Sequence, residues 1–505
     1  MLIRLLSLLV LPLAALIGIA APASADDISA TGRGVVRVVT IAVVDDQVVG
    51  FGHGSGFAVA PNRIVTNAHV VELAERYPDN VVVGVVPTEG DKSYQGKVIA
   101  YDVQRDLALI EFTGARLPQT ALYTGPIDEG GAVVSLGFPG NVDLATARSA
   151  ADYIRPTSPV RSEGVFSGRR SLSDVEVLLH SANIARGNSG GPLLDRCGRV
   201  IGVNSAITRG EEGDSTFGFA IADTELAAFL REAKQPYSAV GTPCTSIEER
   251  LRQDSDADVR AAADAAAARR DVATQAALSR ERALEQARIE AERRRENVMA
   301  IAGLLLVAGA LGIGAAGLLE SRGRRRAAIW TAAGGGVAVV AAVVVFVARP
   351  SGAVDLPAAS VARSGPVVED KALGRLMCRL IPERSRITIS SSEDVPLSWG
   401  AGGCVNGKTQ YVAGNGRWER VLVPEAEQTV SLLSFDPATR TYANTRYLMS
   451  AAGMTAARAA RGDTPGQCTT DPAAITRVVG QQSAVRATLP PLPNEKLVYS
   501  CTSAD

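Results

Sequence analysis

Short runs of Val and Ile recur along residues 33–230, and Gly, Pro, Asn and Asp separate them. The runs lie at 35–44, 56–60, 81–86, 97–101, 107–112, 132–136 and 200–203. Apolar runs of this kind, bounded by turn residues, are typical of short strands. We therefore expect an all-β domain here, closed by a short helix at 224–233.

The next segment, residues 246–297, has a different pattern. It contains neither Gly nor Pro and is rich in Ala, Arg and Glu, which are good helix formers. As one continuous helix it would extend about 78 Å. Large apolar residues are sparse, so a strong coiled-coil seam is not expected. We interpret the segment as a long α-helical stalk, with a bent pair of helices as the alternative.

Two segments without a charged residue follow, 298–319 and 327–348. As helices each would be about 33 Å long, enough to cross the hydrocarbon core of a bilayer. Frequent Gly and Ala would permit the two helices to pack closely. The connecting loop, 320–326, holds four Arg, which favours the cytoplasmic side. We predict two transmembrane helices.

The N-terminus resembles an export signal. One Arg precedes an apolar stretch in residues 1–25, and Ala23 and Ala25 form a small-residue cleavage site. We expect removal before Asp26; an uncleaved anchor is the alternative. Either way the following domain is exported into a disulfide-permissive space. With the Arg-rich loop in the cytoplasm, both large domains lie on the periplasmic side of a bacterial inner membrane.

Composition narrows the possible functions. The chain has 505 residues with 52 basic and 53 acidic side chains, a formal net charge of −1. A dedicated nucleic-acid binder would show a strong basic excess, so no nucleic-acid partner is expected. Hydrophobic residues make up 46% of the chain and aromatic residues only 5%. The signal and the two spans account for part of that apolar share.

The last part of the chain begins with a linker at 349–375, rich in Pro, Ser and Ala. Residues 376–505 then show β-like alternation, for example at 428–435 and 442–447. This predicts a β-rich exported domain. Its cysteines form an even set, which predicts two disulfides in one of three pairings: Cys378, Cys404, Cys468 and Cys501. Cys197 and Cys244 are candidates for a third disulfide, which would tie the stalk to the first domain.

Three patterns of polar residues fall within the first β domain. His69 ends a β-like run, Asp106 leads into an apolar run, and Ser189 lies in a glycine-rich stretch. A serine hydroxyl is a poor nucleophile until a neighbouring base takes its proton, and imidazole titrates near neutral pH. Asp106 would hold the imidazole tautomer and stabilise the imidazolium. The residues predict a catalytic triad.

The glycines around Ser189 allow a tight turn at which backbone N–H groups converge. We expect the amides of Gly187 and Ser189 to form an oxyanion hole, with a contribution of roughly 3–4 kcal/mol per donor.

Other candidates for these roles are weaker. His53 lies in a glycine-rich stretch that we interpret as a turn, and His180 ends the run 175–179 as a strand-end residue. Asp102 competes as the acid but precedes a turn-like segment. No close spacing of ligands indicates a metal, and no cofactor is expected. Two further serines are interpreted as structural: Ser55 and Ser205.

These residues resemble the chymotrypsin-like serine proteases, specifically the HtrA (DegP-like) branch. The resemblance covers about residues 33–232 and rests on 66–71, 105–110 and 187–192, with support from 54–57 and 217–221. It implies an all-β double barrel with the triad in the cleft between the barrels. It also implies that Asn183, six residues before the nucleophile, and Asn204 contribute to substrate binding.

Two departures from that family's pattern stand out. Its members usually carry PDZ domains after the protease, whereas this chain has the stalk and the spans there. Asn188 precedes the nucleophile where digestive relatives carry an Asp, so no activating ion pair with a freed N-terminus is expected. Asn183 is not a carboxylate, so the resemblance implies cleavage after small or aliphatic residues rather than after Lys or Arg.

The leading interpretation is a membrane-anchored serine endopeptidase acting on envelope proteins. Its partners would be protein or peptide substrates, the bilayer, and a second copy through the stalk or the transmembrane helices. The alternative is an envelope ligand-sensing protein whose C-terminal domain carries the function. The expected order is signal 1–25, protease 26–240, stalk 246–297, spans 298–319 and 327–348 joined by the loop 320–326, linker 349–375 and C-terminal domain 376–505.

Overall fold

The computed structural model describes residues 26–208, 216–348, 372–414, 416–463 and 468–504. The predicted signal, and most of the predicted linker, lie outside these residues. The chain divides into two compact units. One unit comprises Met1–Asp254 and Pro366–Asp505, and the other comprises Ser255–Gly365. The two predicted globular domains therefore belong to a single compact unit.

The first part of this unit is a closed six-stranded barrel in the order β1-β2-β3-β6-β5-β4. Its strands are β1 (Val35–Val44), β2 (Gln47–Ala60), β3 (Arg63–Thr66), β4 (Val81–Pro87), β5 (Tyr94–Asp102) and β6 (Leu107–Phe112). The helix α3 (Ala68–Arg76) connects β3 to β4. Buried Val, Ile and Phe side chains fill the interior, among them Val38, Ile64 and Ile110.

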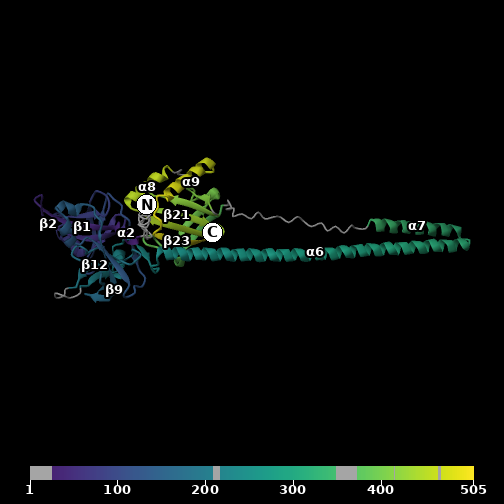
Figure 1. Ribbon diagram of the computed structural model, residues 1–505, viewed down its shortest axis with the longest axis horizontal. Coiled ribbons are helices and arrows are strands. Elements are labelled where there is room, and N and C mark those ends of the chain that lie inside the picture. The colour runs from purple at the N-terminus through teal and green to yellow at the C-terminus, as the bar shows by residue number, and fades with distance from the viewer. Residues whose placement is uncertain (1–25, 209–215, 349–371, 415, 464–467, 505) are drawn as a thin grey trace, which may run out of the picture. The chain divides into compact units, whose positions relative to one another are not determined.

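A second barrel follows (Figure 1). Its sheet has the order β11-β8-β9-β10-β13-β12-β7-β14, and the pairing of β11 with β12 closes it. Its strands are β7 (Ala121–Tyr123), β8 (Ala132–Gly137), β9 (Val160–Leu172), β10 (Val175–His180), β11 (Pro192–Leu194), β12 (Val200–Ile207), β13 (Gly218–Ala222) and β14 (Ser238–Val240). Its helices are α4 (Gly140–Thr146), the 3-10 turn η1 (Ala150–Ile154) and α5 (Asp223–Glu232). The predicted double barrel is confirmed.

Two local predictions in the first barrel are wrong. The glycine-rich stretch around His53 is not a turn but part of β2, where His53 pairs with Val39 of β1. Its glycines serve close packing: a Cβ at Gly54 would lie 2.7 Å from Val70, and one at Gly56 would lie 2.6 Å from Ile64.

The second error concerns His69, which does not end a strand. The strand β3 stops at Thr66, and His69 is the second residue of α3. Asn67 is the N-cap of this helix in extended conformation. An apolar run as short as this one does not by itself distinguish a strand from a strand that passes into a helix.

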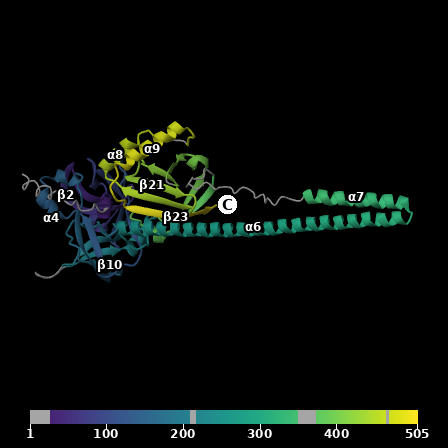
Figure 2. The same ribbon diagram turned by 45° about the vertical axis from the view of Figure 1, so that its right-hand side comes forward.

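The C-terminal part of the same unit is a nine-stranded antiparallel sheet, ordered β18-β17-β16-β15-β23-β22-β21-β20-β19 (Figure 2). Its strands are β15 (Gly374–Leu380), β16 (Val395–Trp399), β17 (Cys404–Val405), β18 (Thr409–Gln410), β19 (Val412–Gly414), β20 (Arg417–Leu422), β21 (Thr429–Asp436), β22 (Thr441–Leu448) and β23 (Glu495–Ser503). Two helices, α8 (Ala451–Arg461) and α9 (Pro472–Arg486), pack on it through a buried cluster that contains Val430, Met454 and Val485.

An aromatic cluster and two disulfides hold this β-rich domain together. The ring of Trp399 packs against those of Tyr411, Trp418 and Phe435, with centroids 5.2, 6.2 and 4.4 Å away. The sequence leaves three ways to pair these four cysteines. The structure has the one that joins Cys378 to Cys501 and Cys404 to Cys468. The third disulfide joins Cys197 to Cys244.

The predicted stalk and the first predicted span form one helix, α6 (Ile247–Ser321), and α7 (Arg325–Val347) follows after a short turn. Both helices contain a segment long and apolar enough to cross a membrane. They contact each other through glycines: a Cβ on Gly335 would lie 2.9 Å from the carbonyl oxygen of Gly309. The two helices therefore pack closely through small residues, as the sequence predicts.

A buried carboxylate of β23 binds a neighbouring segment of the C-terminal domain. Glu495 is fully buried, and its Oε1 accepts hydrogen bonds from the N–H groups of Thr388, Ile389 and Ser390 at 2.7, 2.5 and 2.9 Å. Arg446 lies 3.5 Å from its second oxygen. Hydrogen bonds to a charged group are the stronger ones, so this carboxylate organises the whole segment.

We predict that Glu495→Gln lowers the free energy of unfolding of the full chain by about 2–3 kcal/mol, because a neutral amide replaces the buried charge. The matched control is Glu427→Gln, since Glu427 lies 3.6 Å from the same Arg446 with its side chain 59% exposed. That change should cost under about 1 kcal/mol. Urea unfolding in detergent measures both, and equal losses would contradict the prediction.

Candidate active site

Both barrels contribute to the candidate site. His69 lies in α3 and Asp106 immediately before β6, so the first barrel holds both. Ser189 lies in the loop before β11 of the second barrel. A pocket of about 690 Å³ borders His69 and Asp106, and Glu72, Glu75 and other side chains line it.

The structure brings His69 and Asp106 together. The Nδ1 atom of His69 lies 2.9 Å from each carboxylate oxygen of Asp106, and the His69 backbone N–H donates to Oδ1 at 3.0 Å. The other candidate acid, Asp102, instead pairs with Arg105 at 2.7 Å. A carboxylate on Nδ1 favours the tautomer that carries its proton there, which leaves Nε2 as the basic nitrogen.

The backbone of Asp106 is held in an unusual conformation. Its φ of 54° lies in the left-handed region, which few residues other than glycine adopt. The side chain of Asn67, just before α3, donates to the Asp106 carbonyl at 2.7 Å. Such strain persists where neighbouring groups fix the residue, and at this position it aims the carboxylate at His69.

The Ser189 hydroxyl has a different partner in this structure. It donates to the carbonyl of Ser205 at 3.0 Å, and the contacts of the described residues include no hydrogen bond between it and His69. Ser205 also donates from its own hydroxyl to Oδ2 of Asp106 at 2.7 Å. A rotation about the Cα–Cβ or Cβ–Oγ bond of Ser189 would redirect its hydroxyl from the Ser205 carbonyl.

The loop before Ser189 places two glycines in conformations that side chains rarely adopt. Gly187 has φ 98° and Gly190 has φ 86°. The carbonyl of Arg186 accepts a hydrogen bond from the Gly140 amide at 2.7 Å. Because N–H and C=O of a trans peptide point in opposite directions, the Gly187 N–H is turned away from Gly140. This contact fixes the orientation of the peptide that carries the Gly187 amide.

Ser55 of β2 joins the first barrel to this loop. It is fully buried; its N–H donates to the Ser189 carbonyl at 2.8 Å and its hydroxyl to the Gly187 carbonyl at 2.7 Å. The same hydroxyl accepts the Phe138 N–H at 2.9 Å. Sequence reasoning treated Ser55 and Ser205 as structural and missed these contacts. The glycines flanking Ser55 were the only local signal that another chain segment comes close.

The two asparagines assigned to substrate binding occupy different surroundings. Asn183 is exposed. Asn204 is fully buried, and its amide donates to Ser135, Gly191 and Pro192 at 2.9 to 3.1 Å. Its donor group is therefore committed to the protein interior in this structure.

The remaining two histidines are less exposed than His69. His53 is half-buried, its Nε2 lies 3.2 Å from Oδ2 of Asp143, and burial lowers the pKa of its imidazole. His180 is fully buried, and burial lowers its pKa to about 4. In the part of the chain that the structure describes, no contact joins either histidine to Ser189. Nor do these residues contain a cluster of three His, Cys, Asp or Glu suited to a metal ion.

Comparison with known proteins gives a consistent assignment. Residues 54–203 match the family described as trypsin-like peptidase domain. Serine protease Rv3671c of Mycobacterium tuberculosis is 31% identical over 220 residues, which cover 43% of this chain and 49% of that protein. A probable periplasmic serine endoprotease DegP-like of Chlamydia pneumoniae is 35% identical over 209 residues, 39% of this chain and 38% of that one.

A solved structure is also similar. The crystal structure of the active form of the Rv3671c protease from M. tuberculosis covers 43% of this chain and 87% of that chain, at 25% identity and a TM-score of 0.34. The chain spans half or less of the length of the two curated relatives named above.

We predict that Ser55→Ala lowers kcat of the full chain about 10- to 100-fold with little change in KM, because the loop that carries Ser189 loses its anchor. Thr120→Val is the control: its buried hydroxyl donates to the Ala58 carbonyl at 3.0 Å, away from that loop. Steady-state hydrolysis of a peptide, with unfolding measured alongside, tests this. Equal kcat losses in both variants would mean that Ser55 acts through stability alone.

Proposed function

Residues 54–203 are a trypsin-like peptidase domain, and on this premise we propose that the chain is a membrane-anchored serine endopeptidase that cleaves envelope proteins. The observation that carries the proposal is the contact of His69 with Asp106 at 2.9 Å, next to a serine loop built on positive-φ glycines. Asp106 orients the imidazole, His69 is the base and Ser189 is the nucleophile.

The proposed reaction begins when the Ser189 hydroxyl turns from the Ser205 carbonyl to His69. Nε2 takes the hydroxyl proton while Oγ attacks the carbonyl carbon of the scissile peptide. The carbonyl oxygen becomes an oxyanion, and the amides of Gly187 and Ser189 stabilise it. The imidazolium then gives its proton to the leaving amine, and the acyl-enzyme forms. Water, deprotonated by His69, releases the acid and restores Ser189.

The compact unit supports the two-span topology. Met1–Asp254 and Pro366–Asp505 pack together, yet α6 and α7 separate them along the chain. Two parts that pack together must lie on one side of a membrane, so the chain between them crosses it an even number of times. Three disulfides in this unit favour an oxidising compartment. The Arg-rich turn between α6 and α7 is then cytoplasmic.

A fluorophosphonate probe tests the nucleophile. We predict that the full chain in detergent is labelled and hydrolyses casein, and that Ser189→Ala abolishes both because no hydroxyl remains to be acylated. Ser181→Ala is the matched control, since Ser181 is an exposed serine of the same barrel. Undiminished labelling of the Ser189→Ala variant would refute the assignment.

Cysteine accessibility tests the topology. We expect Cys in place of Thr113, an exposed residue after β6, to react with a membrane-impermeant maleimide in intact spheroplasts. Cys in place of Ser321, at the end of α6, should react only after permeabilisation. All six native cysteines are paired in disulfides, so each variant adds one reactive thiol. Labelling of both variants in intact spheroplasts would contradict the two-span arrangement.

A further inference from the structure

A short helix at the start of the described chain lies between the barrels and the C-terminal domain. This helix, α2 (Asp27–Gly32), has six residues, and five of them are buried: Asp27, Ile28, Ala30, Thr31 and Gly32. A helix this short is not stable by itself in water. Its position is therefore set by what it contacts on either side.

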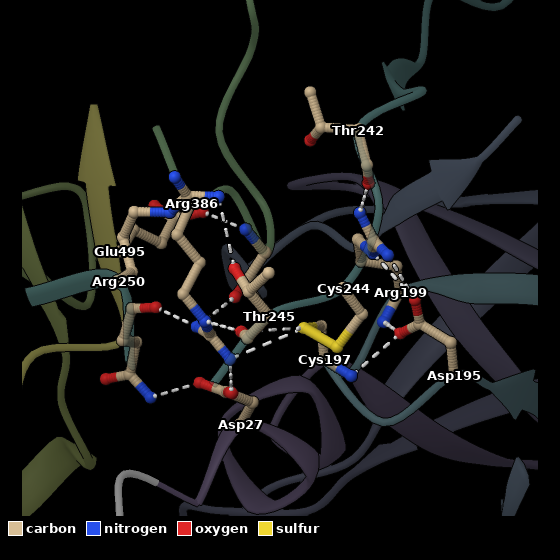
Figure 3. The surroundings of a disulfide bond; sticks show 12 residues. Asp27, Asp195, Cys197, Arg199, Thr242, Cys244, Thr245, Arg250, Arg386 and Glu495 are labelled. Atoms are coloured by element: carbon tan, nitrogen blue, oxygen red, sulfur yellow. Dashed lines mark hydrogen bonds and ion pairs between the residues drawn. A yellow bond between two sulfur atoms is a disulfide. The ribbon is translucent and has the colours of Figure 1, made fainter. Parts of the chain in front are cut away.

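On one side, α2 contacts the C-terminal domain through a buried ion pair. The guanidinium of Arg386 pairs with the Asp27 carboxylate, and both side chains are at most 6% exposed (Figure 3). Asn494 donates to the other Asp27 oxygen at 3.0 Å. Ala30 packs with Ile389 and Leu448 of the C-terminal domain in a small apolar cluster. Two charges this deeply buried are tolerated because they neutralise each other.

Arg386 also contacts the segment that leaves the second barrel. Its Nε donates to the Thr245 carbonyl at 2.7 Å, and its terminal nitrogen lies 3.5 Å from Sγ of Cys197, which is disulfide-bonded to Cys244 (Figure 3). One arginine from the C-terminal domain therefore holds both ends of the peptidase domain: the first helix, through Asp27, and the exit segment, through Thr245.

On its other side, α2 contacts the β11–β12 hairpin. Thr31 donates from its hydroxyl to the Gly198 carbonyl at 2.7 Å, in the turn of that hairpin. A Cβ on Gly198 would lie 2.6 Å from the Thr31 hydroxyl, so helix and turn are in direct contact. Ser189 lies three residues before the start of β11, and Ser205 lies in β12. Pro192 of β11 pairs with Val203 of β12, so Ser189 and Ser205 lie together at the open end of the hairpin, and α2 braces the turn at its other end.

Side-chain hydrogen bonds and a disulfide hold the turn of this hairpin in place. The Asp195 carboxylate accepts the backbone N–H groups of Cys197 and Arg199 at 3.0 and 2.9 Å, and the Arg199 side chain at 2.7 Å (Figure 3). Arg199 is 1% exposed and also donates to the Thr242 carbonyl at 2.5 Å. The disulfide fixes the same turn to residue 244.

From these contacts we propose that the C-terminal domain is a built-in activating partner of the peptidase. Arg386 binds Asp27 and thereby seats α2 against the β11–β12 hairpin, so that the site reaches full activity only after residues 372–504 have docked. This inference rests on the proposed peptidase function. Because α6 and α7 precede Arg386 in the chain, docking also delays activity until the apolar helices have been made.

The test uses the full-length protein in detergent, with the recognition sequence of a site-specific protease placed within residues 349–371. After cleavage, we expect the C-terminal fragment of the otherwise unchanged chain to stay bound and fluorophosphonate labelling to persist. In Arg386→Met, which leaves the Asp27 charge buried without its partner, the fragment should dissociate and the labelling rate should fall at least 10-fold. Arg379→Met is the control, since Arg379 is an exposed arginine of the same domain.

A second variant separates docking from general misfolding. In Asp27→Asn/Arg386→Met the unpaired charge is gone, so fragment retention and labelling should both recover in part. Three results would overturn the proposal: release of the fragment from the unchanged chain, full labelling after release, or loss of labelling in Arg386→Met while the fragment stays bound. If the uncut, unchanged chain is not labelled, the proposed peptidase function is refuted, and the activating role with it. Retention of the fragment would still show whether the C-terminal domain docks on the peptidase domain.

Discussion

The candidate site depends on one junction, the place where β2 of the first barrel meets the serine loop of the second. His69 and Asp106 belong to one barrel and Ser189 to the other, so no element holds all three. Ser55 crosses the gap with hydrogen bonds to the carbonyls of Ser189 and Gly187. Small residues on both sides make this approach possible: a Cβ on Gly190 would lie 2.2 Å from the Ser55 carbonyl oxygen. Geometry that catalysis requires to within a fraction of an ångström is thus fixed by buried backbone contacts.

The junction with the C-terminal domain uses the same physical principle. Burying a charge or a polar group costs free energy unless its partner is in place. Such contacts therefore favour one particular arrangement of the two surfaces. Asp27 and Arg386 are 359 positions apart in the chain, yet each side chain is at most 6% exposed. Apolar packing alone, as between Ala30 and Leu448, would tolerate sliding. The ion pair and its flanking hydrogen bonds select one docked arrangement, in which α2 also contacts the Gly198 turn.

Much of the local structure could be read from the sequence. The strands β1 and β6 begin and end at the residues expected, since long apolar runs between turn residues leave little ambiguity. Errors occurred where packing overrides local preference. The glycines of β2 resemble a turn, but they form a strand because neighbouring side chains fill the space that their own would occupy. The helix α3 follows a run that looks wholly β-like, and only the tertiary setting of Asn67 and His69 ends that strand.

The sequence by itself determined the candidate chemistry: the order His69, Asp106, Ser189, the glycines around Ser189, and the six cysteines are all visible as residue types in a pattern. The tertiary structure decided which groups meet. Ser55 contacts Gly187 across 132 positions of the chain, and Ser205 contacts Asp106 across 99. Nothing in the sequence around either residue indicates its partner. Hydrogen bonds and ion pairs depend on distances of a few ångströms. Those distances are set by barrel closure and domain docking, which bring together residues that no local spacing relates.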